Sequence, residues 1–147
     1  IMLDYFERVN VDMNDDTAAS KKVAGQLQDL VNKYNIAMLT LLQPNKMSGD
    51  MSEPIQSYTN IKGSSYLAQS FRIVLSLFRE GFSPKTPEND KFLTINVLKN
   101  DLGETASLDF SWQGKRGEIH EITEEERMDL ERLRQRKVAE KIGNNDL

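Results

Sequence analysis

The continuous apolar run IAMLTLLQ, at residues 36–43, constrains the fold more than any other part of the sequence. It predicts a strand that is buried on both faces, as the strands of parallel sheets are. A helical pattern precedes this run, since Thr17 can cap a helix that ends near Asn35. The inward positions of the helix recur at spacings of three and four residues, at Val23, Leu27, Leu30, Val31 and Tyr34. A first apolar run at residues 1–5 comes before the helix, so the order strand, helix, strand predicts a βαβ unit, which is almost always right-handed.

The second half of the chain predicts strands of another kind. Residues 64–71 can form a short helix, and RIVLSLF, at residues 72–78, predicts a third buried strand. The segments KFLTINVLKN, at 91–100, and ETASLDFSWQ, at 104–113, predict an antiparallel hairpin, which a short strand at 117–122 follows. We therefore expect an α/β fold with a mixed sheet, in which parallel strands are followed by an antiparallel edge hairpin.

The C-terminal part is strongly charged, and we divide the chain into residues 1–122 and a C-terminal helix with its tail at residues 123–147. Thr123 and Glu126 have the spacing of a capping box, and acidic residues come before basic ones, as the helix dipole favours. The apolar positions of this helix are few: Met128, Leu130, Leu133 and Val138. So thin a stripe predicts a solvated helix that docks weakly.

Composition excludes several kinds of site. The 147 residues contain no cysteine and one histidine, which rules out disulfides and thiolate zinc sites and disfavours a histidine-rich metal site. No apolar run approaches the roughly 18 residues that a membrane span needs, so we expect a cytoplasmic protein without a membrane partner. The net charge of -4 argues against a wholly basic nucleic-acid coat, although local basic clusters can still bind phosphates.

Polar residues end two of the predicted strands. Asp4 follows the apolar run IML, and Gln43 ends the run IAMLTLLQ. In open α/β sheets, ligands lie outside the carboxyl ends of the strands. An aspartate in this place is typical of a Walker B element, whose carboxylate holds Mg²⁺ near nucleotide phosphates, often through water. A glutamine amide can donate to a γ-phosphate and sense its loss. An ordinary strand-end aspartate and a strand-end cap are the alternatives for these two residues.

The order of four motifs resembles a known family. The motifs are IMLDYFERV, NIAMLTLLQPNK, IKGSSYLAQSFRIVLSLFRE and FLTINVLKNDLGETASLDF. From Ile1 to about Ile122 they resemble the C-terminal half of the RecA-like ATPase domain of DnaB-type hexameric replicative helicases. The resemblance implies a RecA-like P-loop NTPase core with ATP and Mg²⁺ as cofactors. It also implies an ATP-driven homo-hexameric ring that translocates on single-stranded DNA and unwinds duplex DNA, with primase and a helicase loader as candidate partners.

Two parts of the family's active site come before the Walker B strand, and neither is recognised in this sequence. They are the Gly-rich phosphate-binding loop with its lysine and the glutamate that activates water. We therefore interpret the chain as a piece of a longer protein that begins at Walker B, and we expect no activity from the chain alone. Other RecA-like ATPases use the same elements, so a recombinase, a DNA-packaging motor or a regulatory ATPase remains an alternative.

The family's roles transfer to single residues. The resemblance makes Asp4 the Walker B aspartate that holds Mg²⁺ and Gln43 the γ-phosphate sensor that couples hydrolysis to the DNA loop. It places Lys99 on the family's arginine finger, which contacts the nucleotide of the neighbouring subunit, and Asn100 on the asparagine beside the finger. Val97 stands where the family has a further lysine, so one of the two cations offered across the subunit boundary is missing.

The resemblance also implies a DNA-binding segment, because residues 46–62 correspond to the DNA-facing loop of the ring's central channel. The expected DNA contacts are Asn45, Lys46, Lys62, Gly63, Ser64 and Ser65. Lys46 replaces the arginine of the family's Asn-Arg pair, so a point charge replaces a bidentate contact. Ordinary solvated surface is the alternative for the two lysines. Residues 70–72, Ser-Phe-Arg, stand where the family has an acidic Asp-x-Asp, which indicates a divergent branch, viral or carried by a mobile element.

Overall fold

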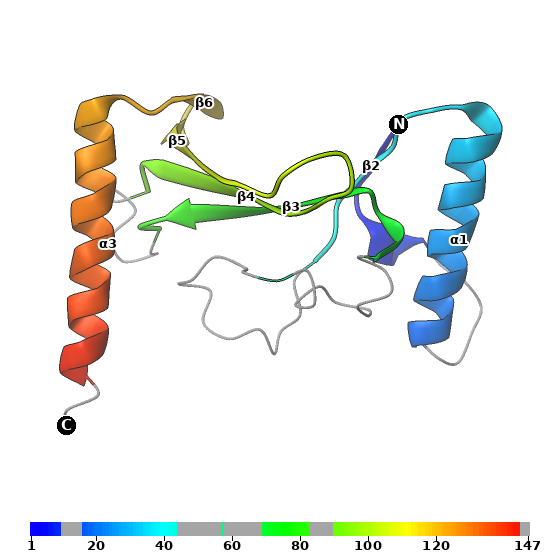
Figure 1. The fold of residues 1–147 in the computed structure, drawn as a ribbon, viewed down its shortest axis with the longest axis horizontal. Coiled ribbons are helices and arrows are strands. Elements are labelled where there is room, and N and C mark those ends of the chain that lie inside the picture. The colour runs from blue at the N-terminus through cyan, green and yellow to red at the C-terminus, as the bar shows by residue number, and fades with distance from the viewer. Residues whose placement is uncertain (10–15, 44–56, 58–68, 83–89, 145–147) are drawn as a thin grey trace. The chain divides into compact units, whose positions relative to one another are not determined.

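The computed structural model describes residues 1–9, 16–43, 57, 69–82 and 90–144 (Figure 1). These residues form two compact units. The first unit holds residues 1–9, 16–43, 57, 69–75 and 97–105, and the second holds residues 76–82, 90–96 and 106–144.

The first unit begins with the predicted strand, helix and strand. These are β1 (Met2–Leu3), α1 (Asp16–Tyr34) and β2 (Leu39–Thr40), with the short 3-10 helix η1 (Phe6–Arg8) soon after the first strand. β1 and β2 pair in parallel, with Met2 opposite Leu39 and Leu3 opposite Thr40. The parallel pairing confirms the predicted connection between the two strands.

Helix α1 follows the prediction in its bounds but less well in its buried face. It ends at Tyr34, after which Asn35 adopts a left-handed backbone with φ of 48°, a conformation that ends helices. Val23 and Ala24 are buried in a core cluster with Phe6 and Val74. The residues packed against this cluster are Leu27, Leu42, Phe71 and Leu98.

The expectation that Leu30 and Tyr34 face inward was wrong, because they are 37% and 59% exposed. The core cluster packs against the middle of α1, and the predicted apolar stripe continues beyond it. The expectation of a strand at residues 36–43 buried on both faces was also wrong. Leu39 and Leu41 lie on one face of this segment and are exposed, whereas Leu42 packs against the core cluster. Only one face of the segment is covered among the described residues.

The remaining strands form a second sheet in the order β3-β4-β5-β6. Their bounds are β3 (Ile73–Glu80), β4 (Phe92–Asn100), β5 (Ser107–Gln113) and β6 (Glu118–Glu121). β4 and β5 pair antiparallel from Phe92 opposite Ser111 to Asn96 opposite Ser107, and β5 and β6 pair antiparallel as well. The predicted hairpin and the short strand after it are therefore confirmed.

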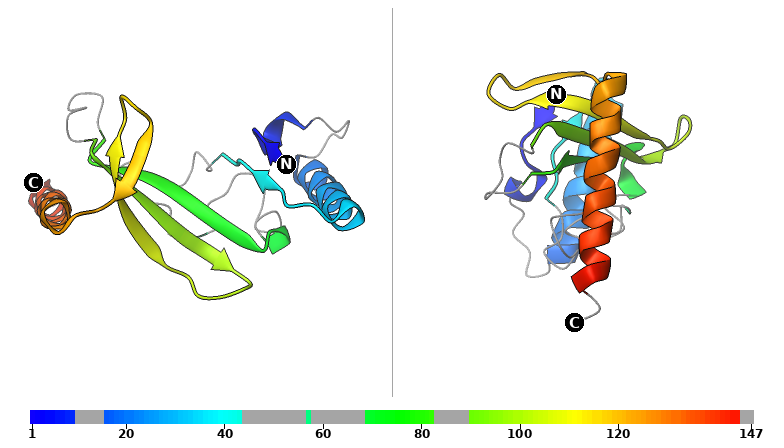
Figure 2. Two further views of the ribbon diagram at one scale, coloured as in Figure 1. Left: turned by 90° about the horizontal axis from the view of Figure 1, so that it is seen from above. Right: turned by 90° about the vertical axis from the view of Figure 1, so that its left-hand side faces the viewer.

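The third predicted strand differs from the expectation. At one end of β3 the N–H of Asp101 donates to the carbonyl of Arg72, at 2.9 Å, and at the other end Arg79 pairs with Asp90. Since residues from the end of β4 meet residues from the start of β3, the two strands are antiparallel (Figure 2). The single mixed sheet that we expected is thus a parallel pair and an antiparallel sheet in the described part of the chain.

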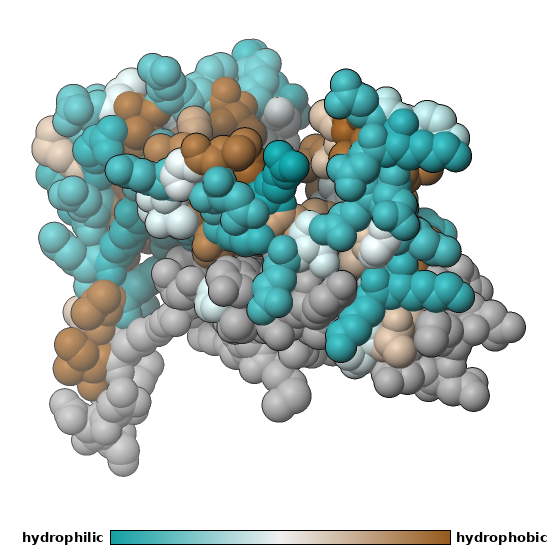
Figure 3. Space-filling view, turned by 45° about the vertical axis from the view of Figure 1, so that its right-hand side comes forward, coloured by the Kyte–Doolittle hydropathy of each residue, from teal (hydrophilic) through white to brown (hydrophobic). Residues whose placement is uncertain are grey.

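β3 is buried on one face only. Val74 and Ser76 are buried, whereas the alternate residues Ile73, Leu75 and Leu77 are exposed, as the period of two in a strand requires when one face is covered. On the face drawn in Figure 3, apolar patches interrupt a largely hydrophilic surface.

In the second unit, helix α3 (Glu124–Asn144) begins with the predicted capping box. The Thr123 hydroxyl accepts the N–H of Glu126 at 3.3 Å, and the Glu126 carboxylate accepts the N–H of Thr123 at 2.9 Å. Both halves of the box are therefore formed.

The weak docking expected for this helix was wrong. Leu130 is only 1% exposed, and two cations of the helix bind carboxylates of the sheet. Arg134 donates to Asp109 of β5, and Lys137 donates to the buried Glu80 of β3 at 2.9 Å. Met128 and Val138, from the predicted apolar stripe, are exposed. Charged pairs supply much of the contact that apolar residues were expected to make.

Candidate functional site

The candidate site lies at the carboxyl ends of β1 and β2. Asp4 directly follows β1, and Gln43 comes three residues after Thr40, the last residue of β2. Backbone hydrogen bonds extend the pairing beyond the strands: the N–H of Leu41 donates to the carbonyl of Leu3 at 3.0 Å, and the N–H of Phe6 donates to the carbonyl of Leu41 at 2.9 Å. Because the two segments run in parallel, they bring Asp4 and Gln43 to the same end of the strand pair, as the sequence predicts.

Asp4 is an exposed carboxylate, and the peptide bond between Asp4 and Tyr5 is cis. No cluster of three or more histidine, cysteine, aspartate or glutamate residues that could hold a metal ion occurs in the part of the chain that the structure describes. Mg²⁺ prefers oxygen ligands and keeps several waters, and in nucleotide sites it uses one or two carboxylates with substrate phosphates. A single exposed aspartate fits that donor set, with the remaining ligands supplied by water and phosphate.

Gln43 is exposed, and its main chain is held. Its N–H donates to the Oε1 of Glu7 at 3.1 Å. Glu7 lies in η1, next to the buried Phe6. The sequence analysis did not single out Glu7; its only signal was a carboxylate three residues after Asp4.

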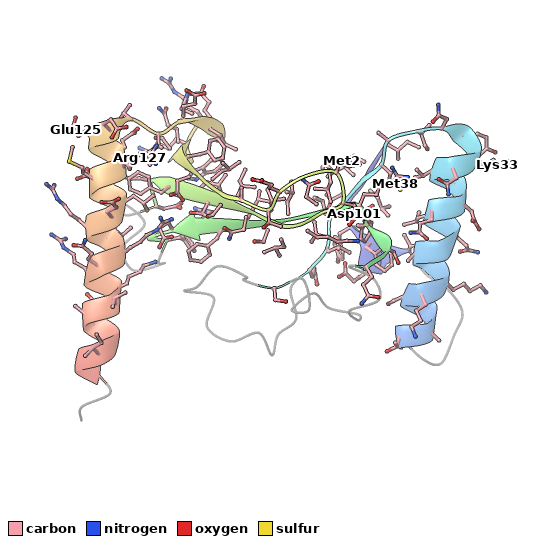
Figure 4. The ribbon with its side chains drawn as sticks, in the orientation of Figure 1. Met2, Lys33, Met38, Asp101, Glu125 and Arg127 are labelled. Carbon is pink, nitrogen blue, oxygen red and sulfur yellow. The ribbon has the colours of Figure 1, made fainter. Side chains whose placement is uncertain are left out.

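Lys99 and Asn100 end β4 within the first unit. The Nζ of Lys99 donates to the carbonyls of Gln69 and Phe71, at 3.0 and 2.6 Å, and lies 3.3 Å from a carboxylate oxygen of Asp101, which Figure 4 labels. The side chain of Asn100 is held by the turn that follows, since its Oδ1 accepts an N–H 3.1 Å away and its Nδ2 donates to a carbonyl 3.0 Å away. In this conformation both side chains bind their own chain, so a contact between Lys99 and a second subunit requires Lys99 to exchange these bonds.

The predicted DNA-binding residues lie outside the described residues. They are Asn45, Lys46, Lys62, Gly63, Ser64 and Ser65. The remaining site predictions, Asp4, Gln43, Lys99 and Asn100, all belong to the first unit, where Leu98 packs against the same core cluster as Phe6.

Comparison with known proteins supports the fold. No protein-family model and no curated protein matches the sequence at a significant level. Among solved structures, one described as the ATPase domain of a DnaB-like replicative helicase matches with a TM-score of 0.70 and 16% sequence identity, over 83% of this chain and 44% of that one. Another, described as a DnaB-like replicative helicase and its interactions with primase, matches with a TM-score of 0.69 and 15% identity, over 83% of this chain and 30% of that one.

The predicted resemblance to the ATPase domains of DnaB-like replicative helicases is confirmed at the level of the fold. The chain spans less than half of either of these two proteins. Within the described residues, neither the length nor the apolar character of any helix is sufficient to cross a membrane.

Proposed function

We propose that this chain is part of an ATP-driven, ring-forming replicative DNA helicase and supplies the C-terminal half of its RecA-like P-loop NTPase core. One observation carries the proposal: Asp4 and Gln43 lie at the same end of a parallel strand pair, in a chain whose fold matches helicase ATPase domains. Ligands of open α/β folds bind at this end of the strands.

Each residue has a separate role in this proposal. The exposed Asp4 carboxylate orients Mg²⁺ through water, and Mg²⁺ supplies positive charge at the phosphates when it is bound. The Gln43 amide donates to the γ-phosphate while it is present and loses that acceptor after hydrolysis. Because β2 leads through Gln43 into residues 44–62, the loss of this bond can be passed to the DNA-binding segment.

The partners follow from the same proposal. Single-stranded DNA binds Asn45, Lys46, Lys62 and residues 63–65, whose lysines and backbone amides suit phosphates. The full-length protein is a homo-hexamer in the bacterial cytoplasm or in a phage-infected cell. Primase is a candidate partner because the second matching structure is described with its primase interactions, and a helicase loader is another.

The test uses the full-length protein that contains this chain. We expect ATP hydrolysis that single-stranded DNA stimulates, together with nucleotide-dependent unwinding of a forked duplex. Asp4→Asn should abolish both activities, whereas Gln43→Ala should still bind nucleotide but lose most of the DNA stimulation. Asp29→Asn and Gln26→Ala, at exposed positions of α1, are the matched controls and should behave as wild type.

Two results would overturn the proposal. DNA stimulation of Gln43→Ala as strong as that of wild type would return Gln43 to a strand cap. Hydrolysis without unwinding of any duplex would favour the alternative, a recombinase, packaging motor or regulatory ATPase of the same fold.

A further inference from the structure

The parallel pairing of β1 and β2 ends on a side chain. Two backbone bonds join the start of the pair, from the N–H of Leu39 to the carbonyl of Ile1 at 2.9 Å and from the N–H of Leu41 to the carbonyl of Leu3 at 3.0 Å. The next N–H on this edge belongs to Gln43, and its acceptor is not a backbone carbonyl but the Oε1 of Glu7, at 3.1 Å. The following residue is Pro44, which has no N–H.

Glu7 is well placed to hold this N–H. It lies in η1 directly after Phe6, which is 4% exposed and belongs to the core cluster. η1 is closed by backbone bonds from the N–H of Arg8 to the carbonyl of Tyr5 and from the N–H of Val9 to the carbonyl of Phe6, at 3.1 and 3.0 Å. The core residue and the closed turn together fix the direction in which the Glu7 side chain leaves the backbone.

The carboxylate is also enclosed. Its second oxygen, Oε2, is buried and has no hydrogen-bond partner among the residues that the structure describes. Water therefore competes poorly for the enclosed group, and a hydrogen bond to a carboxylate is among the stronger kinds. The Gln43 side chain, by contrast, is exposed, so the bond fixes the backbone of Gln43 and leaves its amide available.

We infer that Glu7 is a positioning residue for Gln43, holding the γ-phosphate sensor in register with Asp4; the inference rests on the function proposed above. Asp4 and Glu7 belong to one short segment, three residues apart, so the bond to Gln43 ties the sensor's backbone to the segment that bears the Mg²⁺ carboxylate. A small displacement of a positioned group lowers a rate strongly. The charge of Glu7 is not required for this role, because an amide oxygen at the same place also accepts the Gln43 N–H.

Three substitutions at Glu7 in the full-length protein separate these ideas. Glu7→Gln keeps an acceptor oxygen at the same reach, Glu7→Asp keeps the charge but withdraws it by one methylene, and Glu7→Ala removes both. The ratio of ATPase rates with and without single-stranded DNA is measured for each variant. We expect Glu7→Ala and Glu7→Asp to lower this ratio by about tenfold and Glu7→Gln to stay near wild type. Glu125→Ala, at an exposed position of α3, is the control.

Hydrogen exchange at the Gln43 amide gives a readout that does not depend on activity. It should be about three- to tenfold faster in Glu7→Ala and Glu7→Asp than in wild type, and unchanged in Glu7→Gln. Wild-type exchange in Glu7→Ala and Glu7→Asp, or a coupling loss in Glu7→Gln equal to that in Glu7→Ala, would overturn the inference. If Glu7→Ala does not fold, the Glu7→Asp and Glu7→Gln pair still decides between the outcomes. If exchange changes as expected while the wild-type protein shows no DNA-stimulated hydrolysis, the proposed function fails and the Glu7–Gln43 bond stands.

Discussion

Arg134 of α3 donates to both carboxylate oxygens of Asp109 on β5, at 2.8 and 3.1 Å. The same guanidinium lies 3.4 Å from Glu80 of β3 and donates to the Thr94 hydroxyl of β4 at 3.1 Å. One side chain of the helix thus contacts three neighbouring strands of the sheet. A helix with few apolar residues facing the sheet is held by a planar cation that matches carboxylates in a bidentate way.

Replacing this arginine should destabilise the second unit. Arg134→Met leaves Asp109 without its main donor, while Lys137 still pairs with Glu80. Because the Arg134 side chain is 40% exposed, solvent screening keeps the expected loss to about 1–2 kcal/mol of unfolding free energy. Arg136→Met, at an exposed position of the same helix, should change it by less than about 0.5 kcal/mol. Urea unfolding of the two variants checks this, and equal midpoints would contradict it.

The same contact predicts a dependence of stability on pH. Burial acts to raise the pKa of Asp109, but hydrogen bonds from Arg134 and Thr94 and the charge of Arg134 outweigh it, so the pKa lies below its ordinary value of 3.8. A carboxyl with a depressed pKa in the folded state stabilises the fold above its unfolded pKa and loses this contribution as the pH falls through its folded pKa. Asp109→Asn should therefore be less stable than wild type at about pH 6, and the difference should shrink below about pH 3.8. A difference that is constant from there to the lowest pH at which both proteins fold would contradict this.

The start of α3 allows a sharper comparison between two adjacent glutamates. Glu126 accepts hydrogen bonds from the N–H of Thr123 and from the Ser111 hydroxyl, at 2.9 and 2.8 Å, whereas Glu125, labelled in Figure 4, is exposed. Glu126→Ala should lower the unfolding free energy by about 1 kcal/mol or somewhat more, and Glu125→Ala by a few tenths. Thermal unfolding of both variants measures the difference. Equal melting temperatures would mean that the capping box adds nothing to stability.

The sequence predicted what depends on near neighbours. Thr123 and Glu126 are three residues apart, so their spacing was enough to predict the capping box, which the structure confirms. Arg134 and Glu80 are 54 positions apart, and no local pattern indicates that they meet. The exposed faces of β2 and β3 were mispredicted for a related reason, because an apolar run does not reveal whether a second layer covers it.

The candidate site divides along the same line. Asp4 and Gln43 could be predicted because the carboxyl ends of parallel strands lie at one edge of a sheet. Glu7 could not, because its bond to Gln43 depends on the path of η1 after β1. Side-chain acceptors for a backbone N–H leave no trace in hydrophobic periodicity.

The 147-residue chain alone should not hydrolyse nucleotides. Phosphoryl transfer depends on positioned charge around the phosphates, and this sequence contains neither a Gly-rich loop with its lysine nor a recognised catalytic base. The purified chain should show no ATPase activity above the buffer. Turnover that Asp4→Asn abolishes would contradict this expectation and the role given to the missing loop.

The last prediction is that Lys99 acts across a subunit boundary in the assembled ring. A cation supplied in trans stabilises the charge that develops on the transferred phosphoryl group and can contribute on the order of 10³-fold in rate. In the described conformation Lys99 instead holds the carbonyls of Gln69 and Phe71, so the trans role requires this bond pair to open. Lys99→Ala rings should therefore lose most of their ATPase activity, whereas rings of Lys115→Ala, changed at an exposed lysine, should not.

Mixed rings separate the trans role of Lys99 from a structural one. Subunits with Asp4→Asn and subunits with Lys99→Ala are each inactive alone, but mixed rings contain interfaces that join an intact Asp4 to an intact Lys99, so partial activity should return. If mixing restores nothing although the rings assemble, Lys99 serves the fold of its own subunit through Gln69 and Phe71. Wild-type hydrolysis by Lys99→Ala rings would exclude both roles, because neither the trans contact nor the internal bonds would then be needed for activity.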